Sequence, residues 1–196
     1  MSGDGGLKKE ITMSGDGGLG KEWTTIFDHP DERQLAGWQA LLTTLPRIGT
    51  EWRVAFKFKP TTYNGFSRLT LDLQNFLKIQ FYPNYMNFEF KHQPYAAFHS
   101  KQLTHILPQL GEWTLIEVDQ HQVSRELHCF LFKISIGGIQ IHTENFQHCQ
   151  DFANVQVNTC AHDSFGLACL STVDRYGRVG SIKDMVIKTN LQSLTA

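Results

Sequence analysis

The 196-residue sequence lacks an apolar run of the roughly 18 residues that a membrane-spanning helix needs. It also lacks an excess of one charge sign, because it contains 18 Lys and Arg residues and 19 Asp and Glu residues. The basic residues are scattered along the chain rather than gathered into one patch. We therefore expect no membrane span and no nucleic acid among the partners.

The short motifs of common metal and catalytic sites are missing too. The four cysteines form no CxxC pair, and the nine histidines form no HxH or HExxH. No GxSxG signals a serine nucleophile, and the cysteines do not stand beside a plausible base. We expect no metal, no cofactor and no catalytic residue. The question of an enzyme stays open, but these absences favour binding.

The compartment is not fixed by the sequence. The opening MSGDGGLKKE lacks the apolar stretch of a signal peptide, so the protein is either leaderless or a mature chain with an added start Met. The absence of an Asn-x-Ser/Thr sequon favours a non-secreted or unglycosylated protein. Between the two locations, an extracellular one is favoured over a cytoplasmic one.

Four cysteines are compatible with two disulfides. Cys160 and Cys169 bracket eight residues, and a bridge between them would close a short loop and stabilise the fold by roughly 2–3 kcal/mol. Cys129 and Cys149 flank a Gly-Gly pair, and a bridge between them would staple the two ends of that turn. Alternatively, Cys129 is a plain exposed thiol. In a reducing cell we expect all four to be free.

The N-terminus contains an internal repeat. MSGDGGL occupies residues 1–7 and again 13–19. Two copies cannot make a solenoid, so we predict that residues 1–21 form a flexible Gly-rich arm or a duplicated start, and that removing residues 1–20 costs little stability. Residues 22–196 are predicted to form one domain. Within it, Glu32 to Leu42 fits either a short helix or extended chain.

From Gly49 onward, apolar and polar residues alternate in one short stretch after another. Alternation with a period of two is typical of half-buried strands. Phe132 and Ile134, in the most regular stretch, are predicted core residues, and Gly137-Gly138 after it predicts a tight hairpin. No helical pattern recurs between the strands, which excludes a parallel α/β sheet. The sequence predicts an all-β, antiparallel β-sandwich of the jelly-roll type.

The second half of the chain carries a further pattern. A Trp-containing GEWTLIEVD, a Gly-Gly hairpin, NVQV and a closing GSIKDMVI follow one another. This pattern resembles laminin-G-like and other concanavalin A-like sandwich domains over about residues 49–190. The resemblance implies two curved antiparallel sheets, with ligands on the concave face or at the loop rim, in a family that includes lectins, receptor-binding modules and glycosidases. The galectin motifs HxNPR and WGxE are absent.

One segment, FYPNYMNFEFKHQPYAAFH, mixes flat rings with amide and charged side chains. Rings stack on the apolar faces of sugars, and amides and charges bind hydroxyls. We interpret this patch as a lectin-like carbohydrate-binding site, whose composition also suits a small amphipathic ligand. A homo-oligomer stays open. The candidate residues are Tyr82, Asn84, Tyr85, Asn87, Lys91, His92 and Tyr95.

Two other functions stay open. Glu117 and Asp119 form EVD, which resembles part of the ExDxxE signature of concanavalin A-like glycoside hydrolases; it would imply an active or decayed hydrolase. His121 and Gln122 stand near the position where a proton-donating carboxylate is expected. The alternative interpretation of the pair is a solvent-facing polar strip on an edge strand. A third hypothesis is an adhesion module that binds protein through a sheet face.

Overall fold

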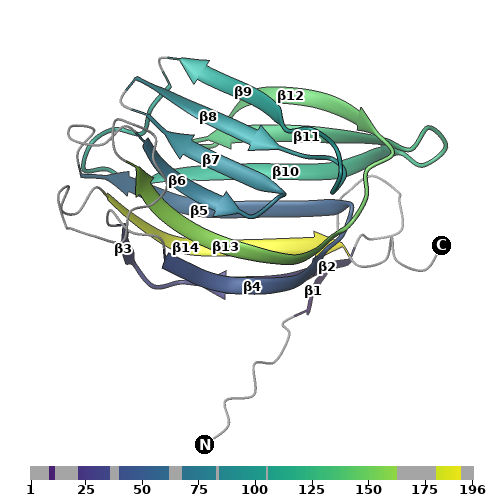
Figure 1. The fold of residues 1–196 in the computed structure, drawn as a ribbon, viewed down its shortest axis with the longest axis horizontal. Coiled ribbons are helices and arrows are strands. Elements are labelled where there is room, and N and C mark those ends of the chain that lie inside the picture. The colour runs from purple at the N-terminus through teal and green to yellow at the C-terminus, as the bar shows by residue number, and fades with distance from the viewer. Residues whose placement is uncertain are drawn as a thin grey trace, which may run out of the picture.

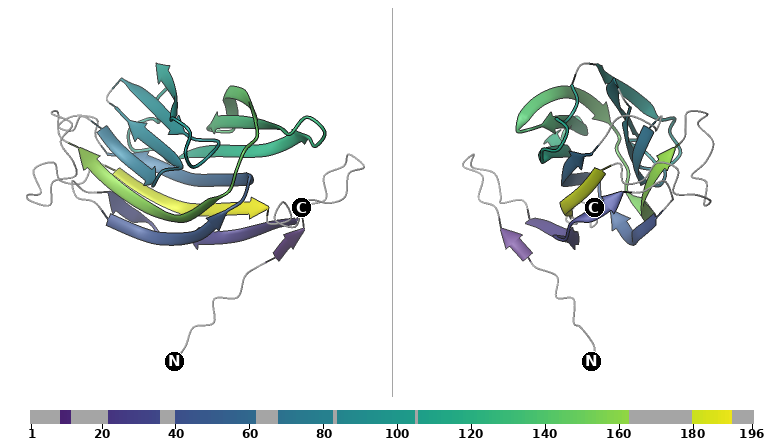
Figure 2. Two further views of the ribbon diagram at one scale, coloured as in Figure 1. Left: turned by 45° about the vertical axis from the view of Figure 1, so that its right-hand side comes forward. Right: turned by 90° about the vertical axis from the view of Figure 1, so that its left-hand side faces the viewer.

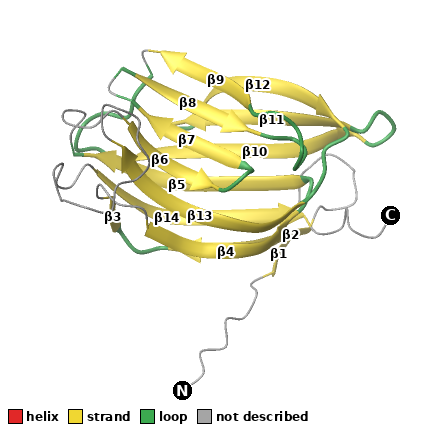
Figure 3. Ribbon diagram, viewed as in Figure 1, coloured by secondary structure: helices red, strands yellow, loops and turns green. Residues whose placement is uncertain are grey.

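The computed structural model describes residues 9–11, 22–35, 40–61, 68–82, 84–104, 106–162 and 180–190. Every regular element in these ranges is a strand (Figure 3). The strands are β1 Lys9–Ile11, β2 Glu22–His29, β3 Arg33–Leu35, β4 Ala40–Ile48, β5 Glu51–Pro60, β6 Arg68–Leu73, β7 Leu77–Phe81, β8 Tyr85–Phe90, β9 His99–Thr104, β10 Thr114–Ser124, β11 Cys129–Ile136, β12 Ile139–Gln147, β13 Phe152–His162 and β14 Gly180–Asn190. The described residues contain no helix that could span a membrane.

The strands form two antiparallel sheets that pack face to face (Figure 1). The eight-stranded sheet has the order β1-β2-β14-β5-β10-β11-β12, with β3 also paired to β14. The six-stranded sheet has the order β4-β13-β6-β7-β8-β9. Figure 2 shows that long strands such as β4 and β13 are curved. The antiparallel β-sandwich predicted from the sequence is confirmed.

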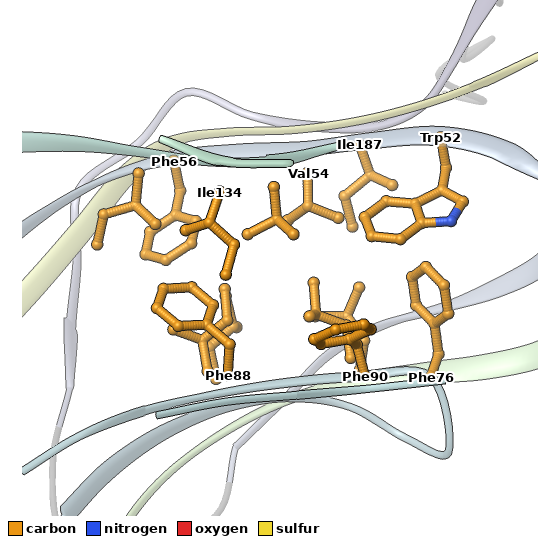
Figure 4. Close-up of a cluster of buried hydrophobic side chains, with 14 of the residues drawn as sticks. Trp52, Val54, Phe56, Phe76, Phe88, Phe90, Ile134 and Ile187 are labelled. Atoms are coloured by element: carbon orange, nitrogen blue, oxygen red, sulfur yellow. The ribbon is translucent and has the colours of Figure 1, made fainter. Parts of the chain in front are cut away.

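The core lies between the sheets and consists of the apolar side chains of the alternating strands. Trp52 and Phe56 of β5 face Phe88 and Phe90 of β8 and Phe76 of the β6–β7 turn across the interior (Figure 4). All five are fully buried, and Trp52 meets Phe76 edge to face at a centroid separation of 4.6 Å. Each buried aromatic side chain removes a large apolar area from water, so this layer supplies much of the stability.

The tight hairpin between β11 and β12 is also confirmed. Gly137 and Gly138 have φ angles of +60° and +81°, as the two central residues of a type I′ turn require. Side chains at both positions would be strained, so glycine is needed there. The turn fixes the register in which β11 meets β12.

The N-terminal half differs in part from the expectations. The helical alternative for Glu32 to Leu42 is wrong, because Arg33–Leu35 and Ala40–Ile48 are strands. Within the predicted arm, the structure describes one strand, β1, which pairs with β2. The remainder of the arm, including both MSGDGGL copies, lies outside the described residues, and its predicted flexibility stays a prediction.

The structure tests one of the two disulfides expected from the sequence. Cys129 and Cys149, predicted as one pair, are both free thiols. Burial, and then the neighbouring thiol of Cys129, raise the pKa of Cys149 to about 12. The expected bridge from Cys160 to Cys169 lies outside the residues whose side chains are described, and it stays a prediction for an oxidising compartment.

Replacing Phe132 by Ala tests the core. Phe132 is fully buried between the sheets and was identified from its strand pattern alone. The Phe132→Ala variant should lose about 3–5 kcal/mol of unfolding free energy in urea titrations, because the cavity cannot collapse fully. A loss below about 1 kcal/mol would show that the side chain does not pack as described.

The raised pKa of Cys149 predicts slow alkylation. Near pH 8 only about one Cys149 side chain in 10⁴ is a thiolate, so iodoacetamide should label it roughly a thousandfold more slowly than an ordinary thiol. Mass spectrometry of timed digests measures the rate. Labelling in urea is the control, since unfolding should restore ordinary reactivity. Fast labelling in the folded protein would contradict the burial of this thiol.

Candidate functional site

The seven residues predicted to bind a ligand are spread along the whole length of β8. A six-residue strand spans roughly 20 Å, so they do not form one cluster. Three of them lie at the start of β8 and three after its end, and the seventh lies within the strand. They are Tyr82, Asn84 and Tyr85 around the β7–β8 turn, Asn87 within β8, and Lys91, His92 and Tyr95 in the loop after β8.

Two tyrosines close the β7–β8 turn. The rings of Tyr82 and Tyr85 stack with centroids 4.2 Å apart and planes inclined by 15°. The backbone N–H of Tyr82 donates to the carbonyl oxygen of Tyr85 at 2.9 Å, which holds the two residues together. Both side chains stay partly exposed, and Asn84 between them is exposed. The turn therefore offers flat apolar surface beside an amide at the rim of the six-stranded sheet.

The outer face of the six-stranded sheet carries two rows of polar residues that run across its strands. Residues directly opposite one another in an antiparallel sheet point to the same face, so the register defines each row. We call them the polar rows. The first consists of Thr70, Gln80, Asn87 and Gln102, on β6 to β9. The second consists of Asn158, Asp72, Lys78, Glu89 and Ser100, on β13 and β6 to β9.

The middle of this face is shielded from water although its side chains point away from the core. Thr70, Gln80 and Asn158 are each no more than 5 % exposed, whereas Asp72 and Glu89 are partly exposed. The hydroxyl oxygen of Thr70 is buried and has no hydrogen-bond partner. A buried hydroxyl without a partner carries an uncompensated desolvation cost.

Asn87 is the centre of a hydrogen-bond network that joins the two rows. Its Nδ2 donates to Oε1 of Gln80 at 3.0 Å and to Oε1 of Glu89 at 3.2 Å. Its Oδ1 accepts a hydrogen bond from Oγ of Ser100 at 2.9 Å. These contacts hold an amide, a carboxylate and a hydroxyl in fixed positions. A site whose polar groups are already ordered loses little entropy when a ligand binds.

The second row carries the charged groups of the face. Burial raises the pKa of the Asp72 carboxyl above its ordinary value, with Lys78 acting in the opposite direction and Glu89 in the same direction. Nζ of Lys78 lies 3.8 Å from Oε2 of Glu89. A cation therefore stands in the row between two carboxyl groups that differ in their surroundings.

An aromatic ring lies beside the charged end of the rows. Phe98 is 38 % exposed, and its ring centroid is 4.6 Å from Nζ of Lys91 and 5.5 Å from Nζ of Lys78. Lys91 also donates to the carbonyl oxygen of Pro94 at 3.4 Å. The structure thus connects Lys91 to the second row through Phe98 and Lys78. Tyr95 is 98 % exposed in the same loop.

His92 belongs to a different group, in which side chains of the two sheets meet. We call it the histidine clasp. The ring of His92 stacks on the ring of Phe146 of β12 with centroids 5.1 Å apart. Nδ1 of His92 lies 3.2 Å from Nε2 of His99 on β9. Nδ1 of His99 is 3.9 Å from Oε1 of Glu144, and Oε2 of Glu144 is 3.5 Å from Nε2 of His142. Among the residues that the structure describes, no three His, Cys, Asp or Glu side chains are arranged to hold a metal ion.

Glu117 and Asp119 lie on the other sheet. Both point outward from β10, where Glu117 pairs with Arg53 and Asp119 lies 3.1 Å from Nδ1 of His121. The interpretation as an edge strand is wrong, because β10 lies between β5 and β11. Each carboxylate already has a cationic or histidine neighbour, and the core separates the pair from the polar rows.

Several residues of this face were not singled out from the sequence: Asp72, Lys78, Gln80, Glu89 and Ser100. A signal was present for those on β6, β7 and β8, which occupy the polar positions of alternating strands, but not for Ser100, because β9 has a single apolar residue. Alternation shows which side chains leave the core, but it does not show which strands are neighbours or in what register. The rows depend on both.

The chain matches no family model and no curated protein. It is similar to several solved structures. One is an HCR/D W1238A mutant, with a TM-score of 0.58, 9 % identity, and coverage of 93 % of this chain and 47 % of that one. Another is the binding domain of botulinum neurotoxin DC in complex with rat synaptotagmin II, with a TM-score of 0.51, 9 % identity, and coverage of 91 % and 47 %.

A third solved structure is an endo-β-1,4-glucuronan lyase from the fungus Trichoderma reesei, with a TM-score of 0.48, 12 % identity, and coverage of 95 % and 87 %. A TM-score below 0.5 supports no argument about this chain. The chain spans about half the length of the first two structures. At these identities the likeness shows a shared sandwich fold alone.

The histidine clasp predicts a loss of stability in acid. Burial first, and then His99, lower the pKa of His92, while Glu144 acts in the opposite direction. The unfolded chain, with a histidine pKa of about 6.5, then binds more protons than the folded one just below that pH. The melting temperature should therefore fall between about pH 7 and pH 5.5, and this fall should be smaller in His92→Gln than in the wild type.

Thermal melts across this range measure the effect. His29→Gln is the matched control, because His29 lies on β2, far along the eight-stranded sheet from β12. It should show the same acid-dependent fall as the wild type. An unchanged fall in His92→Gln would show that His92 does not cause it.

Proposed function

We propose that this chain binds a carbohydrate on the outer face of its six-stranded sheet. The observation that carries the proposal is the network around Asn87, which holds the partly exposed Glu89 carboxylate and the exposed Ser100 side chain in place on that face. Sugar hydroxyls both donate and accept hydrogen bonds, so they suit a surface where amide, carboxylate and hydroxyl groups stand side by side.

The rim of the same face supplies stacking surface. The Tyr82–Tyr85 pair lies at the end of the β7–β8 hairpin, and Phe98 lies beside the charged end of the second row. The C–H faces of sugar rings pack on such rings, while the polar rows between them bind hydroxyls. A glycan that crosses β7 and β8 would meet both kinds of group.

Two other functions have less support. A hydrolase built on Glu117 and Asp119 would have to free Glu117 from Arg53, and His121 and Gln122 stand near the position expected for the proton-donating carboxylate. A protein-binding module is the second candidate. The exposed rings of Tyr95 and Phe98 favour it, and one domain of similar fold was solved in complex with rat synaptotagmin II.

Variants on the two sheets test the proposal. A glycan array with the full chain identifies a ligand, and titration calorimetry measures its affinity. Tyr85→Ala and Ser100→Ala should each weaken binding about tenfold, which is roughly 1.4 kcal/mol, because one removes a stacking ring and the other a hydroxyl. Both side chains are accessible, so the fold should persist.

Glu117→Gln is the matched control on the opposite sheet and should leave the affinity unchanged. Loss of binding in Glu117→Gln, with full affinity in Tyr85→Ala, would move the site to the eight-stranded sheet. Absence of binding to every glycan on the array would reject the carbohydrate proposal and favour the protein-binding candidate.

A further inference from the structure

Two histidines of the histidine clasp are chain neighbours of residues on the proposed binding surface. His92 follows Lys91, and His99 stands between Phe98 and Ser100. Lys91 and Phe98 form the charged and aromatic end of the second polar row, and Ser100 belongs to the hydrogen-bond network in the middle of the face. A change in the position of the two histidine rings is therefore transmitted to the binding surface through a single peptide bond in each case.

The strand that carries His99 and Ser100 depends on the clasp for its position. Among the described strands, β9 is the outermost one of its sheet and pairs with β8 alone. On its other side, the His99 ring meets the ring of Phe146 on β12 with centroids 4.7 Å apart, and His92 stacks on that same Phe146 ring. The clasp thus holds the two ends of the segment from His92 to His99 against the opposite sheet.

The contact between the two histidines depends on their protonation. Nδ1 of His92 lies 3.2 Å from Nε2 of His99. A hydrogen bond between these atoms needs one nitrogen to donate and the other to accept, so at least one ring must be neutral. When both rings are imidazolium ions, both facing nitrogens carry hydrogens and two positive charges stand side by side. The contact then changes from attractive to repulsive.

The charged groups around the pair compensate one proton but not two. Oε1 of Glu144 lies 3.9 Å from Nδ1 of His99, and Oε2 of the same carboxylate lies 3.5 Å from Nε2 of His142. One carboxylate therefore already serves two histidines. Lys101 leaves β9 on the same side as His99 and adds a positive charge. The described contacts of His92 include no ion pair of its own.

The segment after β12 holds the loop through bonds that do not titrate in this range. The carbonyl oxygen of His148 accepts a hydrogen bond from Nε2 of Gln93 at 2.7 Å, and the backbone N–H of Gln150 donates to the carbonyl oxygen of His92 at 2.9 Å. The His148 ring itself lies against His128. The loop therefore stays attached to the other sheet when the His92 and His99 rings separate, so the change is local.

We infer that the histidine clasp makes glycan binding depend on pH. At neutral pH the clasp holds Lys91, Phe98 and Ser100 in the arrangement that binds the glycan. Below about pH 6, where histidines take up protons, the second proton separates His92 from His99 and loosens this end of the surface, and the glycan is released. The inference rests on the proposed function and adds its regulation.

Proton binding and glycan binding oppose each other in this arrangement. The glycan binds the closed clasp, and the second proton binds the open one, so each lowers the affinity for the other by the same factor. The affinity for the glycan should therefore fall as the pH falls, and glycan binding near pH 6 should release a fraction of a proton.

A glycan array read with the full chain at pH 7.5 and at pH 5.5 gives the first test. Calorimetry with the glycan that gives the strongest array signal at pH 7.5 then measures its affinity at both pH values. The wild type should bind it about tenfold more weakly at pH 5.5. In His92→Gln the fall should shrink below about threefold, because glutamine takes up no proton. Calorimetry near pH 6 in buffers of different ionisation enthalpy should show less proton release in His92→Gln than in the wild type.

Hydrogen exchange follows the clasp without a glycan. After correction for the intrinsic exchange rate at each pH, the amides of residues 91–100 should lose protection at pH 5.5 in the wild type but not in His92→Gln. The amides of β11 should stay protected in both proteins. Loss of protection in β11 as well would show that acid unfolds the whole sandwich rather than the clasp, and it would refute the inference.

His29→Gln on β2 is the matched control and should keep the wild-type ratio of affinities between the two pH values. Equal affinity of the wild type at both pH values would overturn the inference and leave the proposed function intact. So would a fall in His92→Gln as large as that of the wild type, because another group would then cause it. Absence of binding to every glycan at pH 7.5 would reject the proposed function itself.

Discussion

Phe90 of β8 stacks on Phe132 of β11 with ring centroids 3.8 Å apart, and this contact joins the two sheets within the core. Both rings are buried, so β8 can pack in only one register without moving Phe90 into water. The period of two along the strand then directs Asn87 and Glu89 to the outer face. A slip by one residue would exchange the faces, so the polar rows exist because the apolar layer beneath them is fixed.

The histidine clasp extends this connection to the edge of the sandwich. His92 belongs to the same loop as Lys91, and the backbone N–H of Gln150 donates to the carbonyl oxygen of His92 at 2.9 Å. The loop is therefore held by the chain after β12 on one side and contributes Phe98 and Lys91 to the polar face on the other. The edge contact between the sheets thus positions one end of the proposed binding surface.

The sequence predicted the parts of this structure that depend on local pattern. Alternation identified Phe132 and Ile134 as core, and the Gly-Gly pair identified a hairpin, because each signal lies within a few residues. The strand order has no such local signal. β13 enters the six-stranded sheet between β4 and β6 only four residues after β12 of the other sheet, and β14 returns to the eight-stranded sheet between β2 and β5. For the same reason Asn87 could be named from its segment, whereas its relation to Asp72 depends on pairing across three strands.

The strand order leaves β4 as an outermost strand of the six-stranded sheet, and this strand contains Pro46. Proline has no N–H to donate, so it is tolerated in a sheet mainly at such a border. A strand from another molecule that tried to extend the sheet here would lose a hydrogen bond in the middle of the new ladder. Pro46 therefore makes the β4 edge a poor template for fibril growth. Such growth is a recurrent hazard for proteins built almost wholly of strands.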